Sequence, residues 1–393
     1  MSGRSADFFF GLFAQARGDF NNSSVIYRSG TITIQGSNSV GIFAGAAANG
    51  SAEITTLPGT TINVIGPPGT PTDPGITAEI SGTAAAGQKI TVNAASTIKV
   101  LGDVPGDSSL FNDPIGIRAL SREDAAITVT LTKDGSITTQ GGQGFGILAL
   151  ARNGSVGSDS VTVTSSGSIT TSGAEAIGIV ADSGTIYRAT RNPAQPLGPG
   201  GNVTVTSSGA ITTQGDQAHG IWAASTTGTV LVNAFNNVTT TGQFSTGINA
   251  ISSGLPGTPG GNVTVNVAQG VSVNGGWQDT GVGSSTFFAL PAAGVILSST
   301  GVTPTLINDG NIGALSDRAV AGDPVVINNG IITGFVQFTG GGNSIENNGT
   351  FNLRHFADTT GAGRDTLRVA IADLGEGLSN SFTNNGRQVR ALV

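Results

Sequence analysis

Composition and charge exclude several classes of protein. The chain has 393 residues, of which 62 are glycine, 37% are hydrophobic, 10% are charged and 5% are aromatic. So few aromatic residues do not fill a conventional large globular core, and so many apolar ones are not typical of a disordered polar segment. The net charge of −7 without a Lys/Arg cluster argues against a nucleic-acid partner, and the lack of cysteine excludes disulfides and thiolate metal sites.

Residues 1–29 contain a short apolar patch, Phe8–Phe13, which Gly11 interrupts. A secretory signal needs an apolar stretch of roughly 7–15 residues before a small-residue cleavage site, and this patch does not fit. We therefore expect an N-terminal cap over the first coil or an incomplete N-terminus. No apolar run in the sequence reaches the length of a transmembrane helix.

One motif recurs between residues 30 and 300. Its clearest copies read VTVTSSGSITTSGAEAIGIVADS at Val161–Ser183 and VTVTSSGAITTQGDQAHGIWAAS at Val203–Ser225. Constant segments joined by loops of variable length are typical of a solenoid. The tetrapeptide G-I-x-A closes each copy, and it begins at Gly41, Gly116, Gly146, Gly178, Gly220 and Gly247.

Within each copy, apolar and polar residues alternate with the period of a β-strand. In VTVT the valines are expected to point inward and the threonines outward. Three short strands with Gly or Ser-Ser corners make one coil, in which the Gly before Ile is expected to allow a bend or a positive φ. The sequence therefore predicts an all-β fold, a right-handed parallel β-helix of about 12–15 coils stacked at about 4.8 Å. Pro/Gly-rich inserts are expected to protrude as loops: Gly66–Gly75, Asn192–Gly201 and Leu255–Gly261.

Residues 301–393 show a shorter, Asn/Gly-rich repeat that we expect to lead toward a missing C-terminal region. Asn308, Asn328 and Asn347 recur in it and are expected to stack as an amide ladder. Phe382 follows Ile345 after 37 positions, close to two periods. We expect Asp365–Asp373 to supply the strand of the intervening coil.

These repeats resemble the passenger region of a type V secretion autotransporter. The resemblance rests on the VTVTSSG-[SA]-ITT-x-G…GI-x-A copies and on the terminal repeats with GGNSIENNGTF, and it covers most of residues 30–386. It implies a secreted bacterial rod at the cell surface or outer membrane, often an adhesin, exported through a C-terminal barrel. This sequence has neither a clear signal peptide nor the alternating strands of a barrel. We therefore expect a fragment of a longer protein or one whose export is lost.

Polysaccharide lyases and hydrolases also use β-helices and need paired carboxylates. The best acidic cluster is Asp103, Asp107 and Asp113 with Arg118, which we interpret as a solvated loop. His219 occupies a position that holds apolar residues in other copies, so we expect a corner or core residue, and His355 is expected to be exposed. We predict no catalytic, cofactor-binding or metal site.

Two ladders of side chains are candidates for contact with a partner. The residue x of G-I-x-A forms the first, which either faces outward as a partly apolar stripe or is covered by an insert. The second is a flat array of outward threonines, broken at Val230–Asn233, of a kind that resembles ice-binding solenoids. The stripe comprises Phe43, Arg118, Leu148, Val180, Trp222 and Asn249, and the array comprises Thr128, Thr130, Thr162, Thr164, Thr204 and Thr206.

The function predicted is adhesion or surface display by a rigid, non-enzymatic rod without a cofactor. Its expected partner is a host or cell-surface protein or glycan, with self-association through coil edges and contact with the outer membrane only through a missing barrel. Three alternatives remain open: a lyase or hydrolase acting on acidic polysaccharides, an ice-binding solenoid, and a structural stalk without a ligand.

Overall fold

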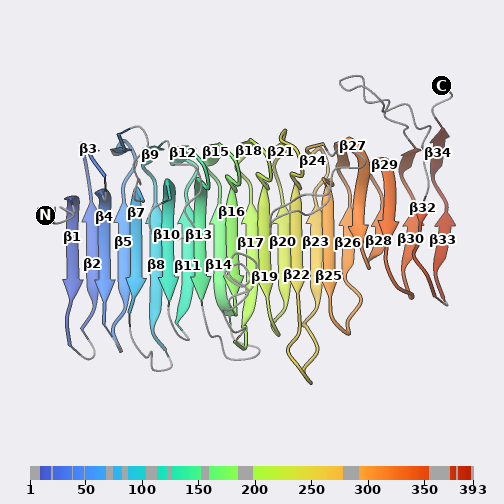
Figure 1. Ribbon diagram of the computed structural model, residues 1–393, viewed down its shortest axis with the longest axis horizontal. Helices are drawn as coiled ribbons and strands as arrows, with labels where there is room; N and C mark the ends of the chain where they lie inside the picture. The colour runs from blue at the N-terminus through green and yellow to red at the C-terminus, as the bar shows by residue number, and fades with distance from the viewer. Residues whose placement is uncertain are drawn as a thin grey trace, which may run out of the picture.

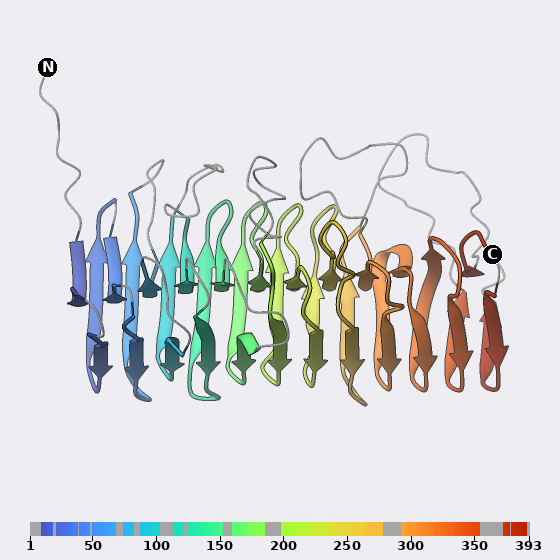
Figure 2. The same cartoon turned by 90° about the horizontal axis from the view of Figure 1, so that it is seen from below.

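The computed structural model is a single stack of β-strands along one axis (Figure 1). It describes residues 9–390 except 19–20, 38, 48, 68–73, 82–86, 103–112, 122–124, 152–158, 185–197, 278–291, 354–371 and 378. The described residues form 34 strands and no helix. In both views the coils follow one another from the N-terminal to the C-terminal end (Figure 1, Figure 2). The fold is a right-handed parallel β-helix, as the sequence predicts.

Three parallel sheets run the length of the rod, and we number them 1 to 3. Sheet 1 carries the VTVT strands of the sequence repeat. Its members are β2 (Ser23–Tyr27), β5 (Ala52–Thr56), β8 (Lys89–Ala94), β11 (Ala126–Leu131), β14 (Asp159–Ser165), β17 (Asn202–Ser207), β20 (Val230–Ala234), β23 (Val263–Val267), β26 (Thr305–Asn308), β28 (Val325–Asn328), β30 (Ser344–Asn347) and β33 (Ser381–Asn384).

Sheet 2 carries the ITT strands, and it shares two strands with sheet 3. Each shared strand is long enough to turn the corner between the two sheets. The members of sheet 2 are β3 (Thr31–Gln35), β6 (Thr61–Ile65), β9 (Thr97–Leu101), β12 (Ser136–Gln140), β15 (Ser168–Ser172), β18 (Ile211–Gln214), β21 (Val238–Thr240), β24 (Ser272–Gly275), β27 (Asn311–Gly322), β29 (Ile331–Phe338), β31 (Thr350–Leu353) and β34 (Arg387–Arg390).

Sheet 3 carries the G-I-x-A strands. It receives β27 and β29 from sheet 2 near its C-terminal end. Its other members are β1 (Phe9–Ala16), β4 (Ser39–Ala46), β7 (Ile76–Ile80), β10 (Ile115–Ser121), β13 (Phe145–Ala151), β16 (Ile179–Ser183), β19 (Ile221–Ser225), β22 (Ile248–Ser252), β25 (Val295–Ser299) and β32 (Ala372–Asp373).

Equivalent residues of successive coils lie directly above one another. Val161 pairs with Val203 and Thr162 with Thr204, so the repeats in the sequence are repeats in space. Sheet 1 has 12 strands, the lower end of the predicted number of coils. At about 4.8 Å per step, the first and last strands lie about 53 Å apart.

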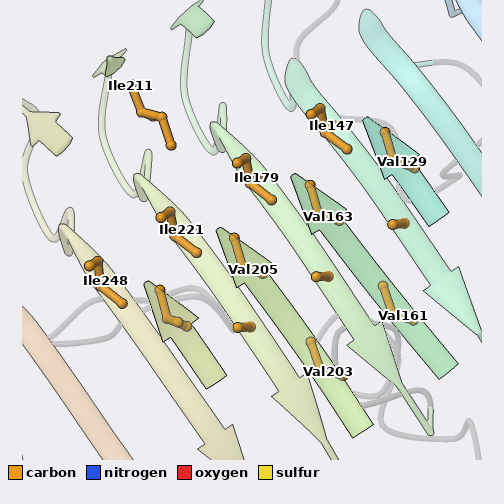
Figure 3. Packing of buried hydrophobic residues seen from close by; sticks show 14 of the residues in the cluster. Val129, Ile147, Val161, Val163, Ile179, Val203, Val205, Ile211, Ile221 and Ile248 are labelled. Atoms are coloured by element: carbon orange, nitrogen blue, oxygen red, sulfur yellow. The ribbon is translucent and has the colours of Figure 1, made fainter. Parts of the chain in front are cut away.

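The core is a column of aliphatic side chains supplied by all three sheets. Figure 3 shows Ile147, Ile179, Ile221 and Ile248 stacked in one row, opposite valines of sheet 1. Each of these isoleucines is fully buried. Because a row is continued by the next coil, no coil has a core of its own, and neighbouring coils bury each other's apolar surface.

The glycine before each Ile serves a close approach rather than a positive φ. A Cβ on Gly178 would lie 2.5 Å from Cγ2 of Ile211 and 2.6 Å from the carbonyl oxygen of Gly220. Both distances are too short for a side chain at this position. The expected positive φ is not found at Gly178, and glycine is needed because sheets 2 and 3 meet tightly there.

The first coil begins earlier than the sequence suggested. Gly11-Leu12-Phe13-Ala14 is a further G-I-x-A copy, in which Leu12 pairs with Ile42 and Ala14 with Ala44. Strand β2 likewise pairs in register with β5. Strands β1 and β2 are therefore part of the β-helix and not a cap placed over it. This copy departs from the G-I-x-A pattern because Leu replaces Ile.

The last coil differs from the expectation of two short periods. Ile345 pairs directly with Phe382, so no coil intervenes between β30 and β33. Of the expected strand Asp365–Asp373, residues 365–371 lie outside the described residues. Ala372–Asp373 pairs with β29 and therefore belongs to the coil of β30 and β31. The 37-residue spacing is one coil with a long insert, since coil length varies with loop length.

The expected amide ladder of Asn308, Asn328 and Asn347 is present, and it extends to Asn384. Each Nδ2 group donates to the Oδ1 atom of the next coil, at 2.7, 2.6 and 2.6 Å. The first three side chains are fully buried. The ladder satisfies these amides without water, which is the condition for placing them inside the rod.

Candidate interaction surface

Two columns of outward side chains, each one residue wide, run along sheet 1 beside a further outward position, which holds Lys89 in β8 and Ala126 in β11. The predicted threonines come together: Thr128, Thr162 and Thr204 stack in the first column. Thr130, Thr164 and Thr206 stack beside them in the second. Between β8 and β26 the complete first column is Thr91, Thr128, Thr162, Thr204, Leu231, Thr264 and Thr305, and the second is Asn93, Thr130, Thr164, Thr206, Asn233, Asn266 and Ile307.

We call these two columns the sheet 1 array. Its rows lie about 4.8 Å apart along the rod, and its columns lie roughly 6.6–6.8 Å apart along the strands. Every member is exposed or partly exposed, and none carries a charge. The surface is therefore an open lattice of hydroxyl, amide and methyl groups.

Asparagines continue the array where the threonines end. Asn233 Nδ2 donates to Thr206 Oγ1 at 3.5 Å, and Asn266 Nδ2 donates to Asn233 Oδ1 at 2.8 Å. The expected break of the threonines at Val230–Asn233 is present in both columns: Leu231 replaces threonine in the first, and Asn233 replaces it in the second, where the surface stays polar. Hydrogen bonds between coils hold the amide groups in register.

Sheet 2 carries a second open threonine column that the sequence analysis did not single out. It consists of the first Thr of each ITT triplet, and Thr138, Thr170, Thr212 and Thr239 lie in register. The alternation in I-T-T shows which Thr faces outward, because the second one is buried: Thr171 Oγ1 donates to the carbonyl oxygen of Ala176 at 3.0 Å.

At the corner between sheets 1 and 2, the copies that contain Ser166 and Ser208 are also polar and neutral. Ser208 Oγ donates to Ser166 Oγ of the preceding coil at 2.9 Å, and both side chains reach the surface. The preceding coil instead carries the exposed pair Lys133 and Asp134 at this corner, so the hydroxyl surface between the sheet 1 array and the sheet 2 column is limited to the coils of Ser166 and Ser208.

Sheet 3 presents a different outer face. The x residues of G-I-x-A stack in one column and face away from the main core. Thr77 belongs to this column as the x residue of a further copy, Gly75-Ile76-Thr77-Ala78. From Arg118 onward, however, these side chains are at most 7% exposed. The column consists of Phe43, Thr77, Arg118, Leu148, Val180, Trp222 and Asn249.

The prediction of an exposed contact stripe is therefore wrong from Arg118 to Asn249. The alternative prediction, that the stripe is covered, agrees with the burial of these side chains. Leu148, Val180 and Trp222 belong to a second apolar cluster, separate from the main core. Burial of these large side chains stabilises the fold. At the N-terminal end Phe43 stays partly exposed, and its ring stacks at 5.1 Å on that of Phe13, the x residue of the first copy, which is 50% exposed.

The interpretation of the acidic cluster as a solvated loop is wrong for Asp113 and Arg118, which are buried. Asp113 is buried at 2% exposure, and Arg118 lies 3.8 Å from Glu79. Asp103 and Asp107 lie outside the described residues. Among the residues that the structure does describe, no group of three or more His, Cys, Asp or Glu could hold a metal ion.

Of the two histidines, the structure describes His219. His219 is fully buried, as expected for a corner or core residue, and its Nδ1 atom accepts a hydrogen bond from the backbone N–H of Thr246 at 3.0 Å. A neutral imidazole is required for this bond. His355 lies outside the described residues.

Comparisons with known proteins give no relative. No protein-family model, no curated protein and no solved structure matches the chain. The described residues contain no helix that is long and hydrophobic enough to cross a membrane.

Proposed function

We propose that this chain is a non-enzymatic rod for adhesion or surface display, and that it contacts its partner through the sheet 1 array. The observation that supports the proposal is the register of that array, open and uncharged from β8 to β26. Sheet 3 contributes to the function only indirectly, because its outer face is covered from Arg118 to Asn249.

A repetitive face suits a repetitive partner. One hydroxyl contact is weak, but contacts repeated along a rigid rod act together once the first is made. Threonine is β-branched and has restricted χ1, so little side-chain entropy is lost on binding. The partner that fits is an extended surface, such as a glycan or a surface protein with regularly spaced polar groups.

The lack of charge in the array gives the proposal a distinctive property. Contacts between neutral groups are not screened by ions, whereas attraction between charged surfaces weakens within a Debye length of about 8–10 Å at physiological salt. Binding through the array should therefore persist at high ionic strength.

The placement at a bacterial cell surface, through an autotransporter barrel, is part of the same proposal. It is supported by the resemblance of the VTVTSSG…GI-x-A copies to autotransporter passengers. The host or cell-surface partner and self-association through coil edges are further predictions of this proposal. No specific observation favours a lyase or hydrolase over the adhesive rod.

The test uses the purified chain and a set of insoluble surfaces, namely chitin, cellulose, alginate gel and fixed animal cells. We expect retention on at least one surface, unchanged between low and high salt, with no release of soluble sugar. Retention that is lost at high salt would contradict the neutral array as the contact surface. Release of unsaturated or reducing sugar products would assign an enzyme instead.

A further inference from the structure

The sheet 1 array is more regular than a β-sheet surface requires. Threonine suits exposed strand positions, and this preference alone could explain a single column. Sheet 2 provides an internal comparison, because its outward column next to Thr138 and Thr170 holds Ser136 and Ser168. On sheet 1, in β11, β14 and β17, both outward positions are threonine in all three coils. In these three coils the array thus has only threonine, whereas the compared positions of sheet 2 include serine; in the other coils the array also holds asparagine, Leu231 and Ile307.

Threonine adds a methyl group and a fixed geometry to the hydroxyl that serine would also provide. The restricted χ1 angle keeps the hydroxyl groups at the spacing of the backbone. That spacing is two-dimensional, about 4.8 Å along the rod and roughly 6.6–6.8 Å across it. The array therefore holds hydroxyl and methyl groups on a rigid lattice.

The open shape of the array limits the kinds of ligand that it can bind. Small molecules bind in concave sites where a few polar groups converge on one ligand. Here the polar groups of β11, β14 and β17 point outward in parallel, so they fit a ligand that is itself a lattice. Ordered water is such a lattice, because every molecule offers donors and acceptors at a constant spacing.

We propose that the sheet 1 array binds the surface of ice. Each threonine hydroxyl takes the place of a water molecule in the outermost ordered layer, and each methyl group lies against the gaps between water molecules. The neutrality of the array favours this ligand, since ions are strongly hydrated and disturb an ordered layer. The inference rests on the proposed function, because it uses the same contact surface and names what that surface adheres to.

The experiment is slow freezing of a dilute solution onto a cold probe, followed by measurement of the protein concentration in ice and in the remaining liquid. The wild-type chain is compared with Thr164→Lys, at the centre of the array, and with Thr170→Lys, an equally simple change on sheet 2. A third variant replaces Thr130, Thr164 and Thr206 with valine, which keeps the shape and removes the hydroxyls. Circular dichroism checks that each variant keeps its β structure.

We expect the wild-type chain to be several-fold enriched in ice, and the Thr170→Lys variant to match it. Thr164→Lys and the triple valine variant should lose most of the enrichment. Exclusion of the folded wild-type chain from ice, to the same degree as a globular control protein, would overturn the inference. Equal loss in Thr164→Lys and Thr170→Lys would also overturn it, because the effect would not belong to the array.

Failure of this inference is distinguishable from failure of the proposed function. Exclusion from ice together with salt-independent retention on chitin, cellulose or cells rejects ice as the ligand and leaves the adhesive rod standing. Product release from a glycan rejects the adhesive rod whatever the result with ice.

Discussion

Many residues in this chain contact a residue of the same type at the equivalent position of the next coil. An inward Ile packs on an inward Ile, and a buried Asn bonds to a buried Asn, as in the ladder from Asn308 to Asn384. The sequence predicts such stacks because the same residue type returns at the same position of each repeat. It does not predict contacts between sheets, such as the one that requires Gly178.

Replacement of Asn328 by alanine should weaken the rod strongly. The change removes the ladder bonds to Asn308 and Asn347 and leaves their buried amide groups without these partners. We expect a loss of about 2–4 kcal/mol in unfolding free energy. Guanidinium denaturation of the purified chain measures it. Asn329→Ala, on the exposed neighbour, is the matched control and should cost about 0.5 kcal/mol or less. Equal losses of unfolding free energy in the two variants would show that the buried ladder stabilises the rod no more than an exposed asparagine does.

Replacement of Gly178 by alanine tests the tight corner between sheets 2 and 3. The new Cβ would press on Ile211 and on the backbone of Gly220, so the coils must move apart. We expect a loss of about 3 kcal/mol or a local loss of order, seen as faster proteolysis. Ser168→Ala, exposed in the same coil, should leave both readouts near wild type. A stable Gly178→Ala variant would contradict the close approach.

At the scale of strands, alternation identifies the inward residues but not the environment of the outward ones. Val161 and Thr162 alternate between core and surface as the sequence predicts. On sheet 3, both Ile221 and Trp222 are buried, although they point to opposite sides. The pattern of one strand cannot show this, because cover over its outer face comes from residues elsewhere in the chain. The signal for this burial in the sequence is the large apolar residues at position x of G-I-x-A.

Replacement of Trp222 by alanine should destabilise the chain by about 3–5 kcal/mol, because the ring is 2% exposed within the second apolar cluster. Phe235 is the control, since its aromatic ring is 54% exposed at the end of β20. Phe235→Ala should change the unfolding free energy by about 0.5 kcal/mol or less. Thermal unfolding followed by circular dichroism compares the two. Similar midpoints would mean that the outer face of sheet 3 is open.

The whole molecule is a one-dimensional stack, and its stability comes from each coil and its contacts with the next. This architecture follows from the sequence, since repetition, Gly corners and period-two alternation all indicate the same fold. The number of coils was harder to predict, because inserts lengthen some of them, as between Ile345 and Phe382. The start of the β-helix is not evident from the motif, because β1 departs from it at Leu12.

The candidate surface was only partly predictable. The T-x-T pattern indicates outward threonines, but whether they form an array depends on register between residues far apart in the chain. Thr91 and Thr305 share one column although more than two hundred residues separate them. Pairing through every intervening coil determines that register, and a repeat with loops of unequal length does not show it.

The distance between residues 91 and 305 tests the register most directly. The chain has no cysteine, so Thr91→Cys and Thr305→Cys can carry spin labels without other changes. Six steps of sheet 1, from β8 to β26, separate the two positions. Pulsed electron–electron resonance should give one narrow distribution near 29 Å, apart from the length of the label arms. A broad distribution, or a mean far above this value, would contradict an in-register rod and with it the array on which the proposed function depends.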